Sequence, residues 1–259
     1  MKSNLCKDGV NLMKCDIVII VRTASTRLPK KALLKIDHTP MILKLINRLN
    51  EIKNAKILIC TTTAQSDNEL VSLLKKNGLA VFRGSNKNIL KRLSDASIKH
   101  KIKQCIIVEA DDLFCDPEII KKTCKQLTKT DKDIILWKNL PFGIPAVGLK
   151  LKNLKNYISK NKIKTSDTGW KEMLLECNMF KVKFASERKK ELCRPDIRLT
   201  IDYKEDYELA KTIYRELGQN FDLKKIIKLI DNNTKLSTSN KKIQKKYEKN
   251  YDIKKQIMR

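Results

Sequence analysis

The 259-residue sequence has little of what marks several common protein classes. Its eight cysteines form no C-x-x-C pair and no cluster with the two histidines, so no zinc-binding motif is present. No segment approaches the roughly 20 consecutive apolar residues that span a bilayer, and residues 1–14 lack an apolar core of signal-peptide length. These absences predict a reduced, cytoplasmic protein with no structural zinc and no membrane partner.

Glycine is scarce as well. The chain has seven glycines, and none lies between Val21 and Ile36, directly after the first predicted strand. This excludes both a Walker A loop and a G-x-G-x-x-G turn at that position, because both need glycine to bring the backbone close to phosphate. The segment carries positive charge instead, on Arg22, Arg27, Lys30 and Lys31.

The formal net charge is +27, from 56 Lys and Arg against 29 Asp and Glu. Phosphate neutralisation by such residues drives non-specific nucleic-acid binding. The lysines, however, are spread over nearly every predicted helix, and no nucleic-acid-binding motif accompanies them. We therefore predict no nucleic-acid partner. A non-catalytic polyanion binder remains an alternative, which would lose its ligand steeply with added salt.

Apolar runs of strand length alternate with helical-period segments, a pattern typical of βα units around a mainly parallel sheet with helices on both faces. The predicted strands are 16–21, 55–60, 79–82, 104–110, 133–137 and 197–202, and the predicted helices are 39–52, 67–78, 88–100, 116–128, 203–217 and 222–232. Asp67 and Asp116 stand where helix N-caps belong. The fold class expected is Rossmann-like α/β.

One main domain is predicted over residues 15–231. Residues 1–14 are expected to be a disordered extension. The alternation loosens over 141–193, which suggests a small inserted flap, and 232–259 form a basic C-terminal tail.

In open α/β sheets, ligands bind beyond the carboxyl ends of the strands. The residues that directly follow the predicted strands, or end the last of them, are Arg22, Ser25, Arg27, Lys31, Arg83, Asp111, Asp112 and Asp202. Arginine offers phosphate oxygens a planar fork and lysine a compact charge, so the first loop suits a triphosphate. Cations and carboxylates on one rim are the arrangement expected for a metal-bound polyphosphate.

Four segments, in order, resemble motifs of the sugar cytidylyltransferases, the group that holds the acylneuraminate and deoxy-manno-octulosonate enzymes. They are "RTASTRLPKK", "VFRGSNKNILKRL", "VEADDLFCDPEII" and "IRLTIDYKEDYEL", and they cover roughly residues 16–217. The first is most similar to the branch of the spore coat polysaccharide biosynthesis protein F, whose pattern is A-R-x-x-S-T-R-L-P-G-K. The chain departs from the family at Lys30, where glycine is usual, and at Leu113, where proline is usual.

The resemblance implies a nucleotidyltransferase of the GT-A type, Mg²⁺-dependent, that transfers CMP from CTP to an acidic sugar or related acceptor in surface glycan biosynthesis. It assigns nucleotide binding to Arg22, Ser25, Arg27, Lys31 and Arg83, with Arg22 and Lys31 acting in catalysis. It assigns the metal to Asp111 and Asp202. It also implies a homodimer, with residues 141–193 supplying the contact.

The two aspartates provide a geometric test. If they hold one ion, the strands that end at Ala110 and Asp202 are expected to be neighbours, and the carboxylates to lie no more than about 8 Å apart. A glycosyltransferase of the GT-A type is the main alternative, with Asp111 and Asp112 holding Mn²⁺ on a nucleotide sugar. The cationic loop argues against it, because the metal already offsets the charge of a diphosphate.

Overall fold

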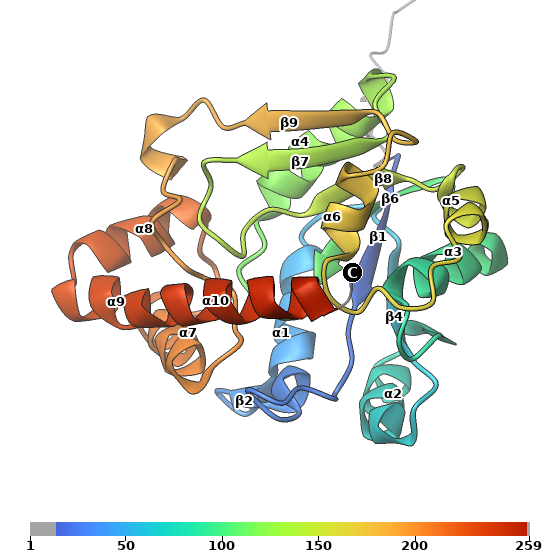
Figure 1. Ribbon diagram of the computed structural model, residues 1–259. Coiled ribbons are helices and arrows are strands. Elements are labelled where there is room, and N and C mark those ends of the chain that lie inside the picture. Colours follow the sequence, from blue (N-terminus) through green and yellow to red (C-terminus); the bar gives the residue numbers. More distant parts are fainter. Residues whose placement is uncertain (1–13, 258–259) are drawn as a thin grey trace, which may run out of the picture.

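The computed structural model describes residues 14–257, so the extension expected over 1–14 lies almost entirely outside the described residues. The chain forms a seven-stranded sheet in the order β5-β4-β1-β6-β8-β7-β9 (Figure 1). The strands are β1 (Asp16–Ile20), β4 (Ile57–Thr62), β5 (Ala80–Gly84), β6 (Gln104–Glu109), β7 (Ile134–Lys138), β8 (Val147–Lys150) and β9 (Val182–Ser186). All pairs are parallel except those of β8, which runs antiparallel to both β6 and β7. The predicted mainly parallel α/β fold is confirmed.

Helices cover both faces of this sheet, because successive strand residues point to opposite sides. Ile17 and Ile19 of β1 belong to one apolar cluster and Val18 and Ile20 to the other. The first cluster takes in α1 (Met41–Leu49), α2 (Asn68–Lys76), α4 (Pro117–Lys129), α7 (Lys204–Leu217) and α8 (Leu223–Asp231). The second takes in α3 (Ile89–His100), α5 (Leu154–Lys160) and α6 (Trp170–Leu175). None of the helices in the described part of the chain has the length and apolarity to cross a membrane.

The shorter elements connect these layers. The two-residue strands β2 (Lys35–Ile36) and β3 (Thr39–Pro40) form a small antiparallel pair before α1. Three 3₁₀ turns, η1 (Lys31–Leu33), η2 (Gln65–Asp67) and η3 (Lys190–Leu192), complete the loops at strand ends and before the last helices.

The strand predicted over 197–202 does not form. Its residues contribute one isolated bridge, between Arg198 and Phe142. The physical reason is that β6 already has β1 and β8 on its two edges, so no edge is left beside it. The segment is nevertheless held against the end of β6, because the amide of Ile201 donates to the carbonyl of Asp111 at 2.9 Å.

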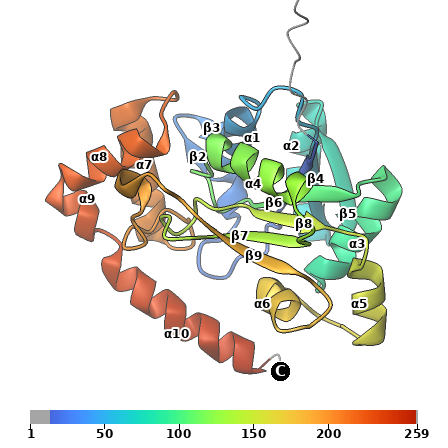
Figure 2. The same cartoon turned by 90° about the horizontal axis from the view of Figure 1, so that it is seen from above.

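The segment 141–193, expected to be a flap, contributes two strands to the sheet. β8 lies inside the sheet between β6 and β7, and β9 forms its edge. The rest of the segment, with α5, α6 and the adjoining loops, lies outside the sheet. The C-terminal part, expected to be a tail, forms α9 (Thr234–Thr238) and α10 (Lys241–Ile257). In both views α10 runs as a separate rod whose far end lies near α6 (Figures 1 and 2).

The two predicted helix caps differ. Asp116 is an N-cap, because its side chain accepts from the amides of Glu118 at 2.9 Å and Ile119 at 3.1 Å. Asp67 makes no cap hydrogen bond. The short turn η2 directs its carboxylate inward, where it is fully buried and accepts from the hydroxyls of Thr23, Thr61 and Thr62. Asp67 therefore connects the first loop to the end of β4 rather than starting a helix.

Candidate active site

A cavity of about 690 Å³ opens at the carboxyl ends of β1 and β6. This volume lies within the range of small-molecule sites, and the location is the one predicted for an open α/β sheet. Seven segments line it, together with side chains of α10: residues 20–32, 89–92, 109–112, 136–137, 142–147, 167–172 and 200–202.

Residues 22–31, which lie within the first of these segments, are called the cationic loop below. Its start is held by Asp67, which accepts from the amide of Thr23 at 2.8 Å and from its hydroxyl at 2.7 Å. Its end turns through Lys30, whose φ of 50° lies in the left-handed region. That backbone favours glycine, which explains why glycine is usual at this position in the family motif.

The turn separates two adjacent lysines. The side chain of Lys30 is 61% exposed and pairs with Glu69 on the surface at 2.7 Å. The side chain of Lys31 is 15% exposed and points into the cavity. Its Nζ lies 2.6 Å from Asp111 Oδ2 and 2.7 Å from Asp202 Oδ1. Burial opposes the charge on Lys31, but the two carboxylates outweigh it and raise the pKa of Lys31 above its ordinary value.

These contacts decide the distance test. Because one nitrogen contacts both, the oxygens of Asp111 and Asp202 are no farther apart than the sum of the two distances, well inside the limit of about 8 Å. Arg27 adds a second cation, with Nη2 at 2.8 Å from Asp202 Oδ1. Burial would raise the pKa of Asp202, but Lys31 and Arg27 lower it to about 2. The aspartates do converge, although Asp202 comes from an irregular segment and not from a neighbouring strand.

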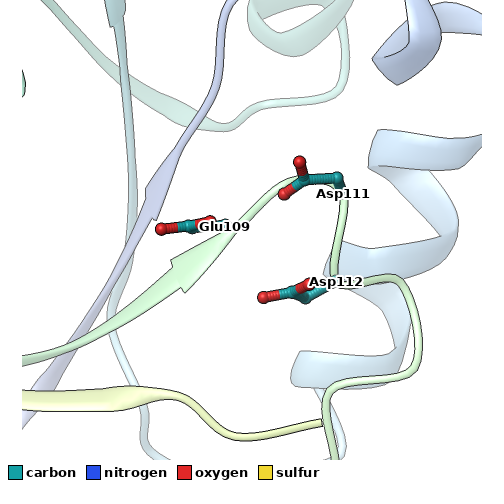
Figure 3. Close-up of side chains that lie close together, drawn as sticks. All are labelled: Glu109, Asp111 and Asp112. Carbon is teal, nitrogen blue, oxygen red and sulfur yellow. The ribbon is translucent and has the colours of Figure 1, made fainter. Parts of the chain in front are cut away.

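Three carboxylates gather beside this contact. Glu109, at the end of β6, and Asp111 and Asp112, on the turn after it, each have a carboxylate oxygen within 4.8 Å of the others (Figure 3). Burial raises the pKa of Asp112 well above its ordinary value, and repulsion from Asp111 and Glu109 raises it further. Carboxylates crowded in this way suit a hard divalent cation, which prefers oxygen ligands. The donor set therefore fits Mg²⁺.

Glu109 was missed by the sequence analysis. Alternation along β6 predicts that it points to the same side as Asp111, two residues later, so the string "EADD" carried the signal. Lys171 pairs with Glu109 at 3.1 Å, and the indole nitrogen of Trp170 donates to it at 3.0 Å. Burial would raise the pKa of Glu109, but these two partners lower it. Trp170 is buried, and its ring belongs to the core.

The remaining predicted nucleotide-binding residues fall in two places. Arg22 and Ser25 line the cavity, and Arg22 forms an ion pair with Asp167. Arg83 does not line it. Its guanidinium donates to the carbonyls of Thr62 and Ala64, each at 2.8 Å, and to the side chain of Asn68 at 2.9 Å. The structure thus gathers every predicted site residue except Arg83, which braces the loop after β4.

Helix α10 forms one wall of the cavity, a feature that the sequence analysis did not predict. The guanidinium carbon of Arg27 lies 5.4 Å from the ring centroid of Tyr203 and 5.6 Å from that of Tyr247. Arg198 binds Asp206 through two nitrogens, at 2.9 and 3.0 Å, and donates to Gln244 of α10 at 2.9 Å. These contacts seat the first half of α10 against the segment that carries Asp202.

Fold and site together define an α/β protein with a cationic loop facing a carboxylate cluster. A sequence model of the cytidylyltransferase family matches residues 17–243, most of the chain. The chain belongs to the cytidylyltransferase family, and it is a CTP-using nucleotidyltransferase. The family predicted from the four motifs is confirmed.

The chain is also similar to other proteins over most of its length. The chain is 32% identical over 241 residues to an uncharacterized protein of Methanocaldococcus jannaschii, covering 90% of this chain and 97% of the relative. It is 27% identical over 239 residues to the spore coat polysaccharide biosynthesis protein SpsF of Bacillus subtilis, covering 86% and 97%. Among solved structures, a cytidylyltransferase from Leptospira borgpetersenii superposes with a TM-score of 0.77 at 25% identity, covering 86% of this chain and 96% of that one.

Proposed function

We propose that the protein transfers CMP from CTP to an acidic sugar or related acceptor, with release of pyrophosphate, in surface glycan biosynthesis. The observation that carries the proposal is the contact of Lys31 with both Asp111 and Asp202 inside the cavity that Arg22 also lines. A triphosphate needs both cations for its oxygens and carboxylates for its metal, and this arrangement offers both.

In this reaction an acceptor oxygen attacks the α-phosphorus of CTP. The bond from that phosphorus to the bridging oxygen breaks, and pyrophosphate leaves with the electron pair. Lys31 and Arg22 donate to oxygens of the β- and γ-phosphates, which gain negative charge as they leave. Lys31 keeps its charge in this buried position, because Asp111 and Asp202 raise its pKa despite burial.

Asp111 and Asp202 would hold Mg²⁺, with Glu109 and Asp112 beside them. A bound magnesium ion would neutralise phosphate charge at that point. Arg27 and Tyr203 hold the Asp202 side of the site, because the guanidinium contacts the carboxylate and lies over the ring. The rate enhancement then comes from positioning and charge neutralisation, as in phosphoryl transfer generally.

The test is to incubate the protein with each of the four ribonucleoside triphosphates, Mg²⁺ and a panel of acidic sugars, and to follow pyrophosphate. The expected result is release that requires CTP and one class of acceptor, and that the Lys31→Ala variant loses. A panel of nucleotide sugars runs in parallel, because a glycosyltransferase would consume a nucleotide sugar and release no pyrophosphate. Consumption of a nucleotide sugar without pyrophosphate release would overturn the proposal in favour of glycosyl transfer.

The expected homodimer stays a prediction. We propose that the loops and helices within 141–193 supply its contact, as the family resemblance implies. Sedimentation velocity over a hundredfold concentration range tests this, and a single monomeric species throughout would contradict it.

A further inference from the structure

Arg92, on the first turns of α3, is a buried cation without a matching anion. Its side chain lines the cavity, yet the residue is only 1% exposed. Its Nε and Nη2 both donate to the carbonyl of Ser85, at 3.0 and 2.8 Å. Within the described part of the chain it forms no ion pair, and its Nη1 has no hydrogen-bond partner. Burial lowers the pKa of Arg92, as expected for a charge with too little compensation.

Asp167 has a buried acceptor atom without a donor. Its Oδ2 pairs with Arg22, whereas its Oδ1 is buried and accepts from no group among the described residues. Asp167 also lines the cavity, and among neighbouring charges it gives the largest support to the charge on Arg92. An unmet buried acceptor such as Asp167 Oδ1 typically costs about 1–3 kcal/mol. Because Arg92, with its free Nη1, lines the same cavity, a ligand bound there can pair with both side chains.

Arg92 and Asp167, called the 92/167 pair below, are held on the same support. The hydroxyl of Ser166 accepts from the amide of Leu90 at 3.0 Å and donates to the side chain of Asn88 at 2.8 Å. The amide of Ser166 donates to the carbonyl of Lys87 at 3.0 Å. These bonds fix the segment before Asp167 to the start of α3, one turn from Arg92. The pair is therefore preorganised, a condition for discriminating closely related ligands.

We propose that the 92/167 pair reads the base of the nucleotide and selects cytosine over uracil. Nη1 of Arg92 donates to N3 of cytosine, and Oδ1 of Asp167 accepts from the 4-amino group. This assignment rests on the proposed function, which supplies CTP as the ligand. Uracil presents an N–H to Arg92 and a carbonyl oxygen to Asp167, so neither side chain would find its partner. Sites built on such hydrogen bonds reject the wrong analogue strongly.

Equilibrium binding of CTP, UTP, GTP and ATP to the full chain, with Mg²⁺ and no acceptor, tests the assignment. We expect CTP to bind at least about tenfold more tightly than UTP, since one hydrogen bond to a charged group amounts to roughly that factor or more. A pyrimidin-2-one triphosphate, which lacks only the 4-amino group, should lose a similar factor. In Asp167→Asn, the amide can donate to uracil as well as accept from cytosine, so the ratio of CTP to UTP affinity should fall to within about threefold.

Two control variants separate base reading from other effects. Lys31→Ala removes a proposed phosphate contact, and Lys31 pairs with Asp111 and Asp202 rather than with the 92/167 pair, so this variant should weaken CTP and UTP by the same factor. Glu172→Gln removes one negative charge from the lining of the same cavity, and it should leave the ratio unchanged. A ribose-binding role for the 92/167 pair would instead weaken both nucleotides equally in Asp167→Asn.

The outcomes separate this inference from the proposed function. Equal binding of CTP and UTP by the wild-type chain, or an unchanged ratio in Asp167→Asn, overturns base reading alone and leaves CMP transfer standing. Binding of no nucleotide overturns both. If circular dichroism shows that Asp167→Asn does not fold, the analogue decides. Loss of the 4-amino group without loss of affinity overturns the inference.

Discussion

The site is assembled from two kinds of region. The cationic loop and the carboxylate cluster follow β1 and β6, two parallel strands paired in register from Asp16 to Ile20. Asp167 and Asp202, in contrast, lie on segments outside any strand and are held by ion pairs and by hydrogen bonds of neighbouring residues. The strand ends fix charges by secondary structure, whereas the irregular segments depend on tertiary contacts to bring theirs to the same cavity. Asp167 and Asp202 therefore reach the cavity only when the tertiary contacts of their segments have formed.

Removing one carboxylate from each region tests most strongly whether the two regions form one site. Asp111→Asn and Asp202→Asn should each nearly abolish turnover, because both carboxylates are proposed ligands of the same Mg²⁺ ion. The double variant should be little worse than either single one, since residues that act as a unit are strongly non-additive. Steady-state pyrophosphate release gives the rates, and the Mg²⁺ concentration for half-maximal rate should rise in both single variants.

A control for these variants lies nearby. Asp196 is on the same irregular segment as Asp202 but outside the cavity, where it pairs with Arg194. Asp196→Asn should keep the wild-type rate. Effects of Asp111→Asn and Asp202→Asn that simply multiply in the double variant would show that the two residues act independently.

The adjacent lysines give the next largest contrast. Lys31→Ala should lower kcat/KM tenfold or more, by analogy with the roughly 10²–10³-fold effect of removing one transition-state donor. Arg22→Ala should do the same. Lys30→Ala, one residue away and paired on the surface, should stay within about twofold of wild type. Similar losses in Lys30→Ala and Lys31→Ala would mean that the loop acts through its total charge rather than through one directed side chain.

Much of the strand-end region could be predicted from sequence. Periodicity located β1 and β6, and their ends then identified Arg22, Lys31 and Asp111. Glu109 needed only the two-residue alternation of a strand. Asp202 was identified as the end of the predicted strand 197–202, and the family resemblance gave its metal role. The strand itself was wrong, because β8, from another part of the chain, occupies that edge of β6.

The remaining site residues could not be predicted in this way. Asp167 lies between short elements, and the hydrogen bonds of Ser166 to the start of α3, with the ion pair to Arg22, hold it at the cavity. Tyr247 lies on α10, whose many lysines resemble those of a solvated helix. Its place in the wall depends on Arg27 and on the network around Arg198, neither of which leaves a local signal in the sequence.

Asp67 tests how strongly the strand-end region depends on one buried group. Asp67→Asn should cost about 2 kcal/mol of unfolding free energy at neutral pH, because an amide cannot replace a carboxylate that accepts from several threonine donors. Burial would raise the pKa of Asp67, but the threonine hydrogen bonds outweigh it and lower the pKa below 3.8. The wild type therefore has its full excess of unfolding free energy over Asp67→Asn above the unfolded-state pKa near 4. It loses this excess as pH falls through the lower folded-state pKa. Urea unfolding at pH 7 and near pH 3 measures it, and an equal difference at both would contradict this role.

Asp112→Asn should have the smallest effect on stability, and it should raise stability where Asp67→Asn lowers it. Burial and its two acidic neighbours disfavour its charge, so Asp112→Asn should stabilise the metal-free protein by about 1 kcal/mol. The same variant should gain less from added Mg²⁺ than the wild type does. Thermal unfolding in EDTA and in excess Mg²⁺ measures both differences. A lower melting temperature for Asp112→Asn in EDTA would show that the cluster is not under electrostatic strain.

The central claim is that Lys31, Asp111 and Asp202 mark a shared site for a metal-bound triphosphate, joined from the two kinds of region. A crystal structure with CTP and Mn²⁺ tests it most directly, because the anomalous signal of manganese locates the ion. The account predicts one ion within about 2.5 Å of a carboxylate oxygen of both aspartates, and Lys31 Nζ on a phosphate oxygen. An ion bound elsewhere, with Lys31 still joining the two carboxylates beside a bound nucleotide, would contradict it.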